Sequence, residues 1–312
     1  MFELKPIPNV PEFKEMFVER YSRLTNWEEF KKFTTSFLRK SIRINTLKKP
    51  VKEVVARLEN DWNLEQIPWC REGFYIESKH GRLDVGNTIE HCLGYYYVQE
   101  AASMIPPIVL EPKPGERVLD MAAAPGSKAS QMAQLMRNEG ILVANDVAGV
   151  RLAALGINLQ RCGVLNAIIT QMKGEQMRDM EFDKVLLDAP CSGTGTIRKS
   201  IKTILMWNPE MIKRLAATQR KMIIAAYGLL ARGGTLVYST CSTEPDEDEA
   251  VVSYLLDNTD ARVVPIELNI RRSPAIAEFE GKAYRKEVKD CLRIWPQDND
   301  TEGFFVAKIR KP

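Results

Sequence analysis

Two cysteines occupy turns that directly follow apolar segments. Cys191 lies in "DAPCSGTGT" (188–196), three residues after Asp188, and Cys241 lies in "VYSTCSTEPDEDE" (237–249). A deprotonated cysteine is a strong nucleophile, so either thiol could form a covalent bond with a substrate. A free cysteine is more often a small buried hydrophobic residue. We expect that role for the other cysteines, which are Cys70, Cys92, Cys162 and Cys291.

The residues around these thiols narrow the chemistry. The sequence contains no CxxC pair, and its only histidines are His80 and His91. A structural zinc site is therefore not expected. A cysteine hydrolase is a remote alternative, because no histidine lies in either thiol motif. The sequence shows no signal peptide and no apolar run of membrane-spanning length, so we expect a cytoplasmic protein with free thiols.

Apolar and amphipathic segments alternate regularly after about residue 98. Strands that are apolar along their whole length, rather than at alternate residues, are typical of a sheet covered by helices on both faces. The pattern predicts an α/β domain with a doubly wound, mostly parallel sheet and an antiparallel C-terminal strand. The predicted strands are 117–121, 141–146, 166–170, 184–188, 234–240 and 303–310, and the predicted helices are 127–138, 149–162 and 209–231.

The first part of the chain has a different character. Helices are predicted near 11–36 and 50–60, with a strand at "SIRINT" (41–46). We expect a smaller α+β domain over residues 1–98 and the larger α/β domain over residues 99–312.

The order of the strands predicts where the thiols meet. In a sheet of order 3-2-1-4-5, the fourth strand lies between the first and the fifth, about 4.8 Å from each. Asp188, Cys191 and Cys241 should therefore converge on one rim of the sheet. A helix is expected directly after Cys241, and its N-terminus would lower the pKa of that thiol, an effect that the acids at 246–249 in the same first turn would partly offset. These acids are interpreted mainly as a helix-start device without a catalytic role.

A small-residue turn follows the first strand of the sheet. "DMAAAPGSKAS" (120–130) places Ala122, Ala123, Ala124 and Gly126 where a ligand can approach the backbone, and Pro125 stiffens the turn. Asp146 ends the next strand and could accept hydrogen bonds from a ribose. The turn could also be only a tight connection. Without a glycine run for a diphosphate, the pattern favours an adenosine ligand, and S-adenosylmethionine fits that description.

The distribution of basic residues along the chain indicates a possible binding partner. The chain has 312 residues and a net charge of only +3, but residues 30–52 contain eight Lys or Arg and no acid. Residues 195–232 contain eight more basic residues against one acid. Two such runs indicate either solvated faces or contact with a polyanion.

These motifs resemble the Nol1/Nop2/Sun family of RNA cytosine-5 methyltransferases. The resemblance rests on "DMAAAPGSK", "DAPCSGTG" and "YSTCS", together with "RINTL" (43–47), "YVQEAAS" (97–103) and "GFFVAK" (303–308). It implies a Rossmann-like methyltransferase sheet preceded by an RNA-binding domain, with S-adenosylmethionine as cofactor. DNA cytosine methyltransferases lack the second thiol, so RNA rather than DNA is the expected substrate.

The resemblance also implies roles for individual residues. Cys241 would bond to C6 of cytosine, Asp188 would hold the base edge, and Cys191 would assist removal of the C5 proton and release of the RNA. Two departures from the family keep the residue small, at Ala122 and at Ser127. The cofactor would be surrounded by Ala122, Ala123, Ala124, Pro125, Gly126, Ser127, Lys128, Asp146, Arg151, Asp188 and Lys173, the last in place of the usual acid.

The compact size resembles archaeal tRNA methyltransferases of the family more than the larger ribosomal ones. We therefore expect a monomer that modifies tRNA, with rRNA as the alternative substrate. A non-catalytic RNA-binding or assembly factor on the same fold is the alternative from another class. The target base must leave its stack, and Arg198 and Lys199 could then touch phosphates. Trp207 could stack on a base or belong to the core.

Overall fold

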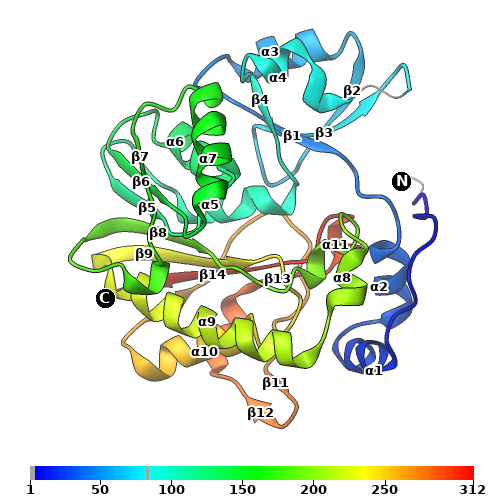
Figure 1. The fold of residues 1–312 in the computed structure, drawn as a ribbon, viewed down its shortest axis with the longest axis vertical. Helices are drawn as coiled ribbons and strands as arrows, with labels where there is room; N and C mark the ends of the chain where they lie inside the picture. Colours follow the sequence, from blue (N-terminus) through cyan, green and yellow to red (C-terminus); the bar gives the residue numbers. More distant parts are fainter. Residues whose placement is uncertain (1–3, 82–83) are drawn as a thin grey trace.

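The large sheet has the strand order that the sequence predicts. The computed structural model describes residues 4–81 and 84–312. The sheet runs in the order β10-β14-β9-β8-β5-β6-β7 (Figure 1). The strands are β5 (Arg117–Asp120), β6 (Ile141–Asn145), β7 (Ala167–Thr170), β8 (Phe182–Asp188), β9 (Leu230–Thr240), β10 (Arg262–Val264) and β14 (Phe304–Arg310), with β13 (Leu292–Ile294) paired to β14.

The strands from β7 to β9 are parallel, and β14 runs antiparallel to β9. Counted from β5, the order of the parallel strands is 3-2-1-4-5, so the fold prediction is confirmed. The largest boundary differences are of three or four residues. β9 begins at Leu230 rather than 234, and the helices predicted at 127–138 and 209–231 end at Leu135 and Gly228.

Helices cover both faces of this sheet, which explains the continuous apolar strands. Neighbouring residues of β5 point to opposite faces of the sheet. Leu119 packs in one core cluster, with the helices that follow β8 and β9, and Val118 packs in the other core cluster. The first face is covered by α9 (Pro209–Gly228) and α10 (Glu249–Asn258), and the second by α5 (Ile105–Leu110), α6 (Ser127–Leu135) and α7 (Gly149–Cys162).

A second, antiparallel sheet occupies the upper right of Figure 1, in the order β2-β3-β1-β4. Its apolar face packs on α3 around Ile42, Ile44 and Trp62. The elements are β1 (Ser41–Ile44), α3 (Val51–Leu58), β2 (Trp62–Gln66), β3 (Gly73–Ser78), α4 (Ile89–Cys92) and β4 (Tyr96–Val98). This is the small α+β unit that the sequence predicts, and the 98/99 boundary itself stays a prediction.

The segment near 11–36, which the sequence predicts to be helical, forms two helices that lie apart from the small sheet. α1 (Glu15–Leu24) and α2 (Trp27–Thr34) lie beside α8 (Lys202–Met206) and α11 (Pro296–Asn299) at the right of Figure 1. Phe17, Tyr21 and Phe30 share one apolar cluster with Trp207 and Trp295. Trp207 is only 1% exposed, so it is a core residue rather than a platform for a base.

Arg43 joins the two sheets. It belongs to the basic run 30–52, yet it is 1% exposed and donates to Gln99 at 2.8 Å and to Ser130 of α6 at 2.8 Å, as well as to Gln134. Burial lowers the pKa of its guanidinium. This member of the run is therefore a structural cross-link and does not belong to a solvated basic face.

We predict that Arg43→Ala lowers the free energy of unfolding by about 2–3 kcal/mol, because it leaves buried acceptors on Gln99 and Ser130 unpaired. Chemical denaturation followed by tryptophan fluorescence measures the change. Lys52→Ala, which removes an exposed cation of the same run, should change it by less than about 0.5 kcal/mol. Equal effects of the two substitutions would contradict the cross-link.

Candidate active site

Register between β8 and β9 brings the two thiols together. Asp188 pairs with Ser239, and the chain turns at the carboxyl end of both strands. The sulfur atoms of Cys191 and Cys241 lie 3.2 Å apart. The convergence expected from strand order is thus present, and both side chains are half-buried at the rim.

Asp188 is held between two polar side chains on the same rim. Its Oδ1 accepts a hydrogen bond from Ser239 Oγ at 2.8 Å, and its Oδ2 accepts one from Lys128 Nζ at 2.7 Å. Burial alone would lower the pKa of Lys128, but the charge and hydrogen bond of Asp188 outweigh it and raise that pKa. Lys128 also interacts with the charge of Cys241. A cation therefore lies beside the carboxylate and the thiol pair.

The two thiols differ in their surroundings. The hydrogen bond to Cys241 and burial raise the pKa of Cys191 well above its ordinary value, and the nearby Glu247 carboxylate adds to the shift. Cys191 is therefore the thiol that keeps its proton at neutral pH, which leaves the role of nucleophile to Cys241.

The environment of Cys241 differs from the expectation in one respect. α10 begins at Glu249, eight residues after Cys241, so no helix N-terminus adjoins the thiol and that prediction is wrong. The loop that contains Gly195 touches the chain at Cys241 and at Gly303, and Gly195 allows this close contact because it has no side chain. Gly195 N–H donates to the carbonyl oxygen of Cys241 at 3.0 Å, and a Cβ on Gly195 would lie 2.1 Å from the Gly303 oxygen.

The acidic run after Cys241 is also not an exposed helix start. Glu247, Asp248 and Glu249 are each fully buried. Arg293 binds Asp248 at 3.0 Å and Glu249 at 2.5 Å. Glu249 does lie in the first turn of α10, as the interpretation as a helix-start device requires, but buried ion pairs and hydrogen bonds also hold Glu247, Asp248 and Glu249 inside the protein.

Glu247 is the site residue that sequence reasoning missed. It accepts hydrogen bonds from Ser192 N–H at 3.0 Å, from Ser242 Oγ at 2.7 Å and from Gln219 Nε2 at 3.0 Å, and also from Ser192 Oγ. Ser192 and Ser242 each directly follow one of the thiols. One buried carboxylate thus fixes both thiol loops. The sequence signal for this contact is that a serine directly follows the cysteine in both thiol motifs.

The turn after β5 is built as a small-residue cradle. Asp146 is 2% exposed and accepts from Ala124 N–H at 3.2 Å and from Ala148 N–H at 3.0 Å. Arg151 lies 3.3 Å from Asp146 and also donates to the Ala124 carbonyl. Gly126 has a φ of 104°, which favours glycine. The remaining lone pairs of Asp146 can still accept from a ligand.

Asp120 ends β5 beneath this turn and was not among the expected site residues. It is 1% exposed, and within the described part of the chain no hydrogen bond of ordinary geometry reaches its carboxylate oxygens. Burial, with repulsion from Asp188, raises its pKa to about 7. An unpaired buried carboxylate at this position suits a positively charged ligand.

Lys173, which the sequence analysis places beside the cofactor, is exposed after β7.

Arg198 also differs from the expectation that it touches phosphates. Its side chain is fully buried and donates to the carbonyl oxygens of Ser36 at 3.1 Å and Phe37 at 2.7 Å. It also pairs with Asp300 at 2.7 Å. Arg198 is therefore unavailable to a ligand, whereas its neighbour Lys199 is exposed.

No group of His, Cys, Asp and Glu side chains suited to a metal ion occurs within residues 4–81 and 84–312. In the same residues, no helix is long and apolar enough to cross a membrane.

A doubly wound sheet with a small-residue turn at β5 and polar side chains at the ends of β8 and β9 defines a Rossmann-like methyltransferase fold. A solved structure described as a methyltransferase homologue from Pyrococcus horikoshii has the same fold, with a TM-score of 0.87 and 39% identity over 96% of each chain. The profile of the family described as 16S rRNA methyltransferase RsmB/F matches residues 107–310. The chain belongs to this family of methyltransferases.

The comparisons extend to the first part of the chain. Residues 13–101 match the N-terminal domain of 16S rRNA methyltransferase RsmF. A tRNA (cytosine(49)-C(5))-methyltransferase of Pyrococcus abyssi is 50% identical over 96% of this chain and 98% of its own length. Ribosomal RNA small subunit methyltransferase F of Vibrio vulnificus is 41% identical over 95% of this chain, which spans 64% of that protein.

We predict that Glu247→Ala lowers the free energy of unfolding by about 2–3 kcal/mol, because the donors of Ser192, Ser242 and Gln219 lose their buried acceptor. Methyl transfer should fall at least about tenfold, since the thiol loops lose their common anchor. Denaturation and a methylation assay measure the two effects. Glu267→Gln, on an exposed loop, is the control, and an unchanged methylation rate in Glu247→Ala would refute the anchoring role.

A second prediction concerns pH. Because the folded-state pKa of Asp120 lies near 7, above its unfolded value, the native state binds more protons between about pH 4 and 7. The free energy of unfolding should therefore fall as pH rises through this window, by at most about 1.4 kcal/mol per pH unit from this group. Asp120→Asn should flatten the dependence. Parallel denaturation curves of both proteins from pH 4 to 8 measure it, and identical slopes would contradict the assignment.

Proposed function

We propose that this protein transfers a methyl group from S-adenosylmethionine to C5 of cytosine in RNA, and that tRNA is its substrate. The observation that carries the proposal is the pair of sulfur atoms of Cys191 and Cys241, 3.2 Å apart beside Asp188. Membership of the family supports a methyltransferase, and the similarity to a tRNA cytosine-5 enzyme supports the substrate.

Cys241 is the nucleophile in this proposal. Its thiolate adds to C6 of cytosine, which forms a bond between Sγ and C6 and moves an electron pair of the ring to C5. S-adenosylmethionine, when bound, supplies an electrophilic methyl group to that carbon. Asp188, fixed by Ser239 and Lys128, faces the polar edge of the base as a hydrogen-bond acceptor.

Cys191 completes the reaction as a base. The hydrogen bond to Cys241 is the largest cause of the raised pKa of Cys191, ahead of burial. That cause is removed once Cys241 Sγ is bonded to C6, while burial and Glu247 remain, so Cys191 releases its proton to solvent more easily at that stage. It takes the proton from C5, the Sγ–C6 bond breaks, and Cys241 returns as a thiolate.

The turn residues hold the cofactor. Ala122, Ala123, Ala124, Gly126 and Ser127 would let it approach the backbone, and Asp146 would bind its ribose. The unpaired carboxylate of Asp120 fits the positive charge that S-adenosylmethionine carries. Pro125, Lys128, Arg151, Asp188 and Lys173 remain predicted neighbours of the cofactor. A monomeric state, a cytoplasmic location and discrimination against DNA also stay predictions.

Two alternatives remain open to test. Similarity to a ribosomal RNA methyltransferase over 95% of this chain favours rRNA as the second candidate substrate. An RNA-binding factor without activity would keep the fold alone. Incubation with methyl-labelled S-adenosylmethionine and either tRNA or rRNA transcripts separates them. We expect label at cytosine C5 in tRNA. Label in rRNA alone would show that rRNA is the substrate. No label in either RNA would refute the proposed activity.

We predict opposite results for the two thiols. Cys241→Ala should abolish turnover, because no bond to C6 can form. Cys191→Ala should leave a covalent protein–RNA adduct that survives denaturing electrophoresis, because the C5 proton is not removed. Cys92 is exposed, so the expectation that it is a buried hydrophobic residue is wrong, whereas Cys70, Cys162 and Cys291 are buried as expected. Cys92→Ala, distant in sequence from both motifs, should keep wild-type turnover. An adduct formed by Cys241→Ala instead would reverse the assigned roles.

A further inference from the structure

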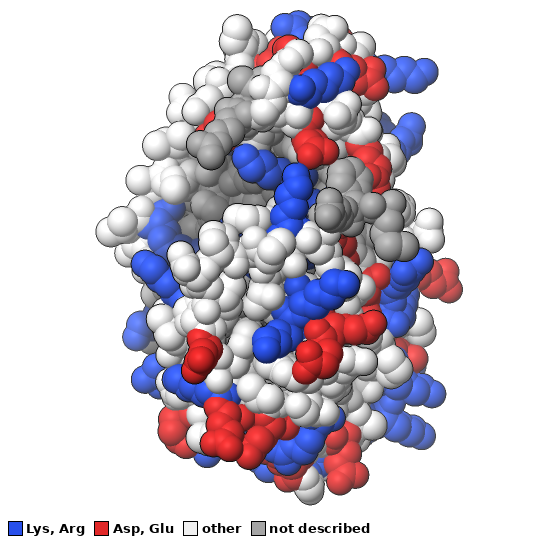
Figure 2. All heavy atoms as spheres, turned by 90° about the vertical axis from the view of Figure 1, so that its right-hand side faces the viewer, with Lys and Arg blue, Asp and Glu red and all other residues white. Residues whose placement is uncertain are grey.

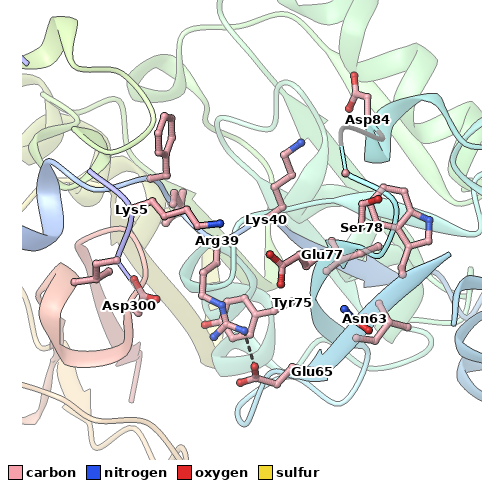
Figure 3. A pocket seen from close by; sticks show the side chains of 17 residues that line it. Lys5, Arg39, Lys40, Asn63, Glu65, Tyr75, Glu77, Ser78, Asp84 and Asp300 are labelled. Carbon is pink, nitrogen blue, oxygen red and sulfur yellow. Dashed lines mark hydrogen bonds and ion pairs between the residues drawn. The ribbon is translucent and has the colours of Figure 1, made fainter. Parts of the chain in front are cut away.

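A cavity of about 740 Å³ lies outside the thiol site, between the small sheet and the chain segment that leads into it. Its walls come from Leu4 and Lys5, the segment 37–40, strands β2 and β3, Gly81, Asp84 and Asp300 (Figure 3). Figure 2 shows this side of the molecule, which is hollowed in its upper half, with Lys and Arg side chains at the hollow. The volume is in the range of ligand sites.

Side chains from both sets of alternate positions on the small sheet line the cavity. Asn63 pairs with Glu77 and Glu65 pairs with Tyr75, so these four side chains share one face. The alternate residues Trp62 and Ile76 belong to the core with α3 and also line the cavity. The cavity wall thus combines an amide and carboxylates on a rigid sheet.

Phe37 supplies an aromatic surface at the cavity. Its side chain is 55% exposed, although its backbone is fixed at both ends. The Phe37 N–H donates to the Lys5 carbonyl at 2.8 Å, and its carbonyl accepts from Arg198 at 2.7 Å. An exposed aromatic ring on an immobilised backbone is preorganised for stacking on a planar ligand.

Three basic side chains, Lys5, Arg39 and Lys40, also line the cavity, together with the carboxylates of Glu65, Glu77, Asp84 and Asp300. Arg39 stacks over the Tyr75 ring at 3.7 Å and binds Glu65 at 2.6 Å. Lys5 and Lys40 are exposed at the cavity, and in residues 4–81 and 84–312 neither makes an ion pair. Figure 3 shows Lys5 and Arg39 on one side and Asn63 and Ser78 on the other. The cavity therefore offers stacking, cations for phosphate, and acceptors for an amino group.

The cavity is mechanically joined to the thiol site. Arg198 lies seven residues after Cys191 in the sequence and binds both the Phe37 carbonyl and Asp300, which are parts of the cavity wall.

We propose that this cavity binds a second unpaired nucleotide of the RNA that carries the target cytosine. The inference rests on the proposed function for the identity of that RNA. The base stacks on Phe37, its phosphate lies near Lys5 and Lys40, and its exocyclic amine donates to Glu77 and Asn63. Amine-bearing bases are therefore accepted, and uracil, which lacks the amine, is disfavoured roughly tenfold.

The first test is kinetic and uses the full chain with tRNA transcripts. Phe37→Ala should raise KM for tRNA about tenfold with kcat within about twofold, because stacking contributes to binding alone. Lys40→Gln should raise KM less and weaken its salt dependence. Tyr254→Ala, at an exposed aromatic of α10, and Lys52→Gln are the matched controls. Unchanged circular dichroism and melting temperature show that the variants fold.

The second test does not need activity. Photolabelling of the wild type with 8-azido-AMP, followed by peptide mass spectrometry, should mark the segment 37–40, and Phe37→Ala should lose the mark. Labelling without any KM effect would indicate a site for a free nucleotide and overturn the proposal. Neither labelling nor a KM effect would overturn it while the methyltransferase assignment stands. No methylation by the wild type would refute the assigned activity separately.

Discussion

The pairing of β8 with β9 is the constraint on which the rest of the site depends. These parallel strands are in register from Val185 with Leu236 to Asp188 with Ser239, so their ends emerge side by side. Two turns that are 50 residues apart in the chain then place their sulfur atoms 3.2 Å apart. A displacement by one residue would send one thiol to the opposite face of the sheet, because side chains alternate along a strand. The apolar cores on both faces hold that register.

Buried charge maintains the loops beyond the strand ends. Carboxylates are costly to bury, and here each is offset by a defined partner. Arg20 binds Glu244 at 2.7 Å, Arg293 binds Asp248 and Glu249, and serine hydroxyls bind Glu247. The network locks the segment after Cys241 without a histidine or a helix N-terminus near the thiol. The raised pKa of Cys191 then distinguishes the two thiols of the pair.

Two buried arginines connect the small sheet to the site. Arg43 reaches from β1 to α6, directly behind the small-residue turn, and Arg198 reaches from the loop after Cys191 to the segment entering β1. Both come from basic runs whose composition indicates a polyanion partner, yet neither is available to one. The basic surface that remains for RNA is thus smaller than a count of basic residues implies, although most Lys and Arg of the two runs, such as Lys31, Lys52 and Lys199, are exposed.

The sequence by itself determined the α/β class, the strand order and the meeting of Asp188, Cys191 and Cys241, because continuous apolar strands and short turns leave few topologies. It also indicated the small-residue turn with Asp146. Only the tertiary structure decided that Glu247 anchors both thiol loops, that Asp120 is an unpaired carboxylate and that Arg198 is buried. Their partners lie far away in the chain, as Glu247 and Ser192 do, 55 residues apart. Local sequence patterns indicate which residues become buried. The role of a buried charge, however, depends on the side chains that the three-dimensional fold packs against it.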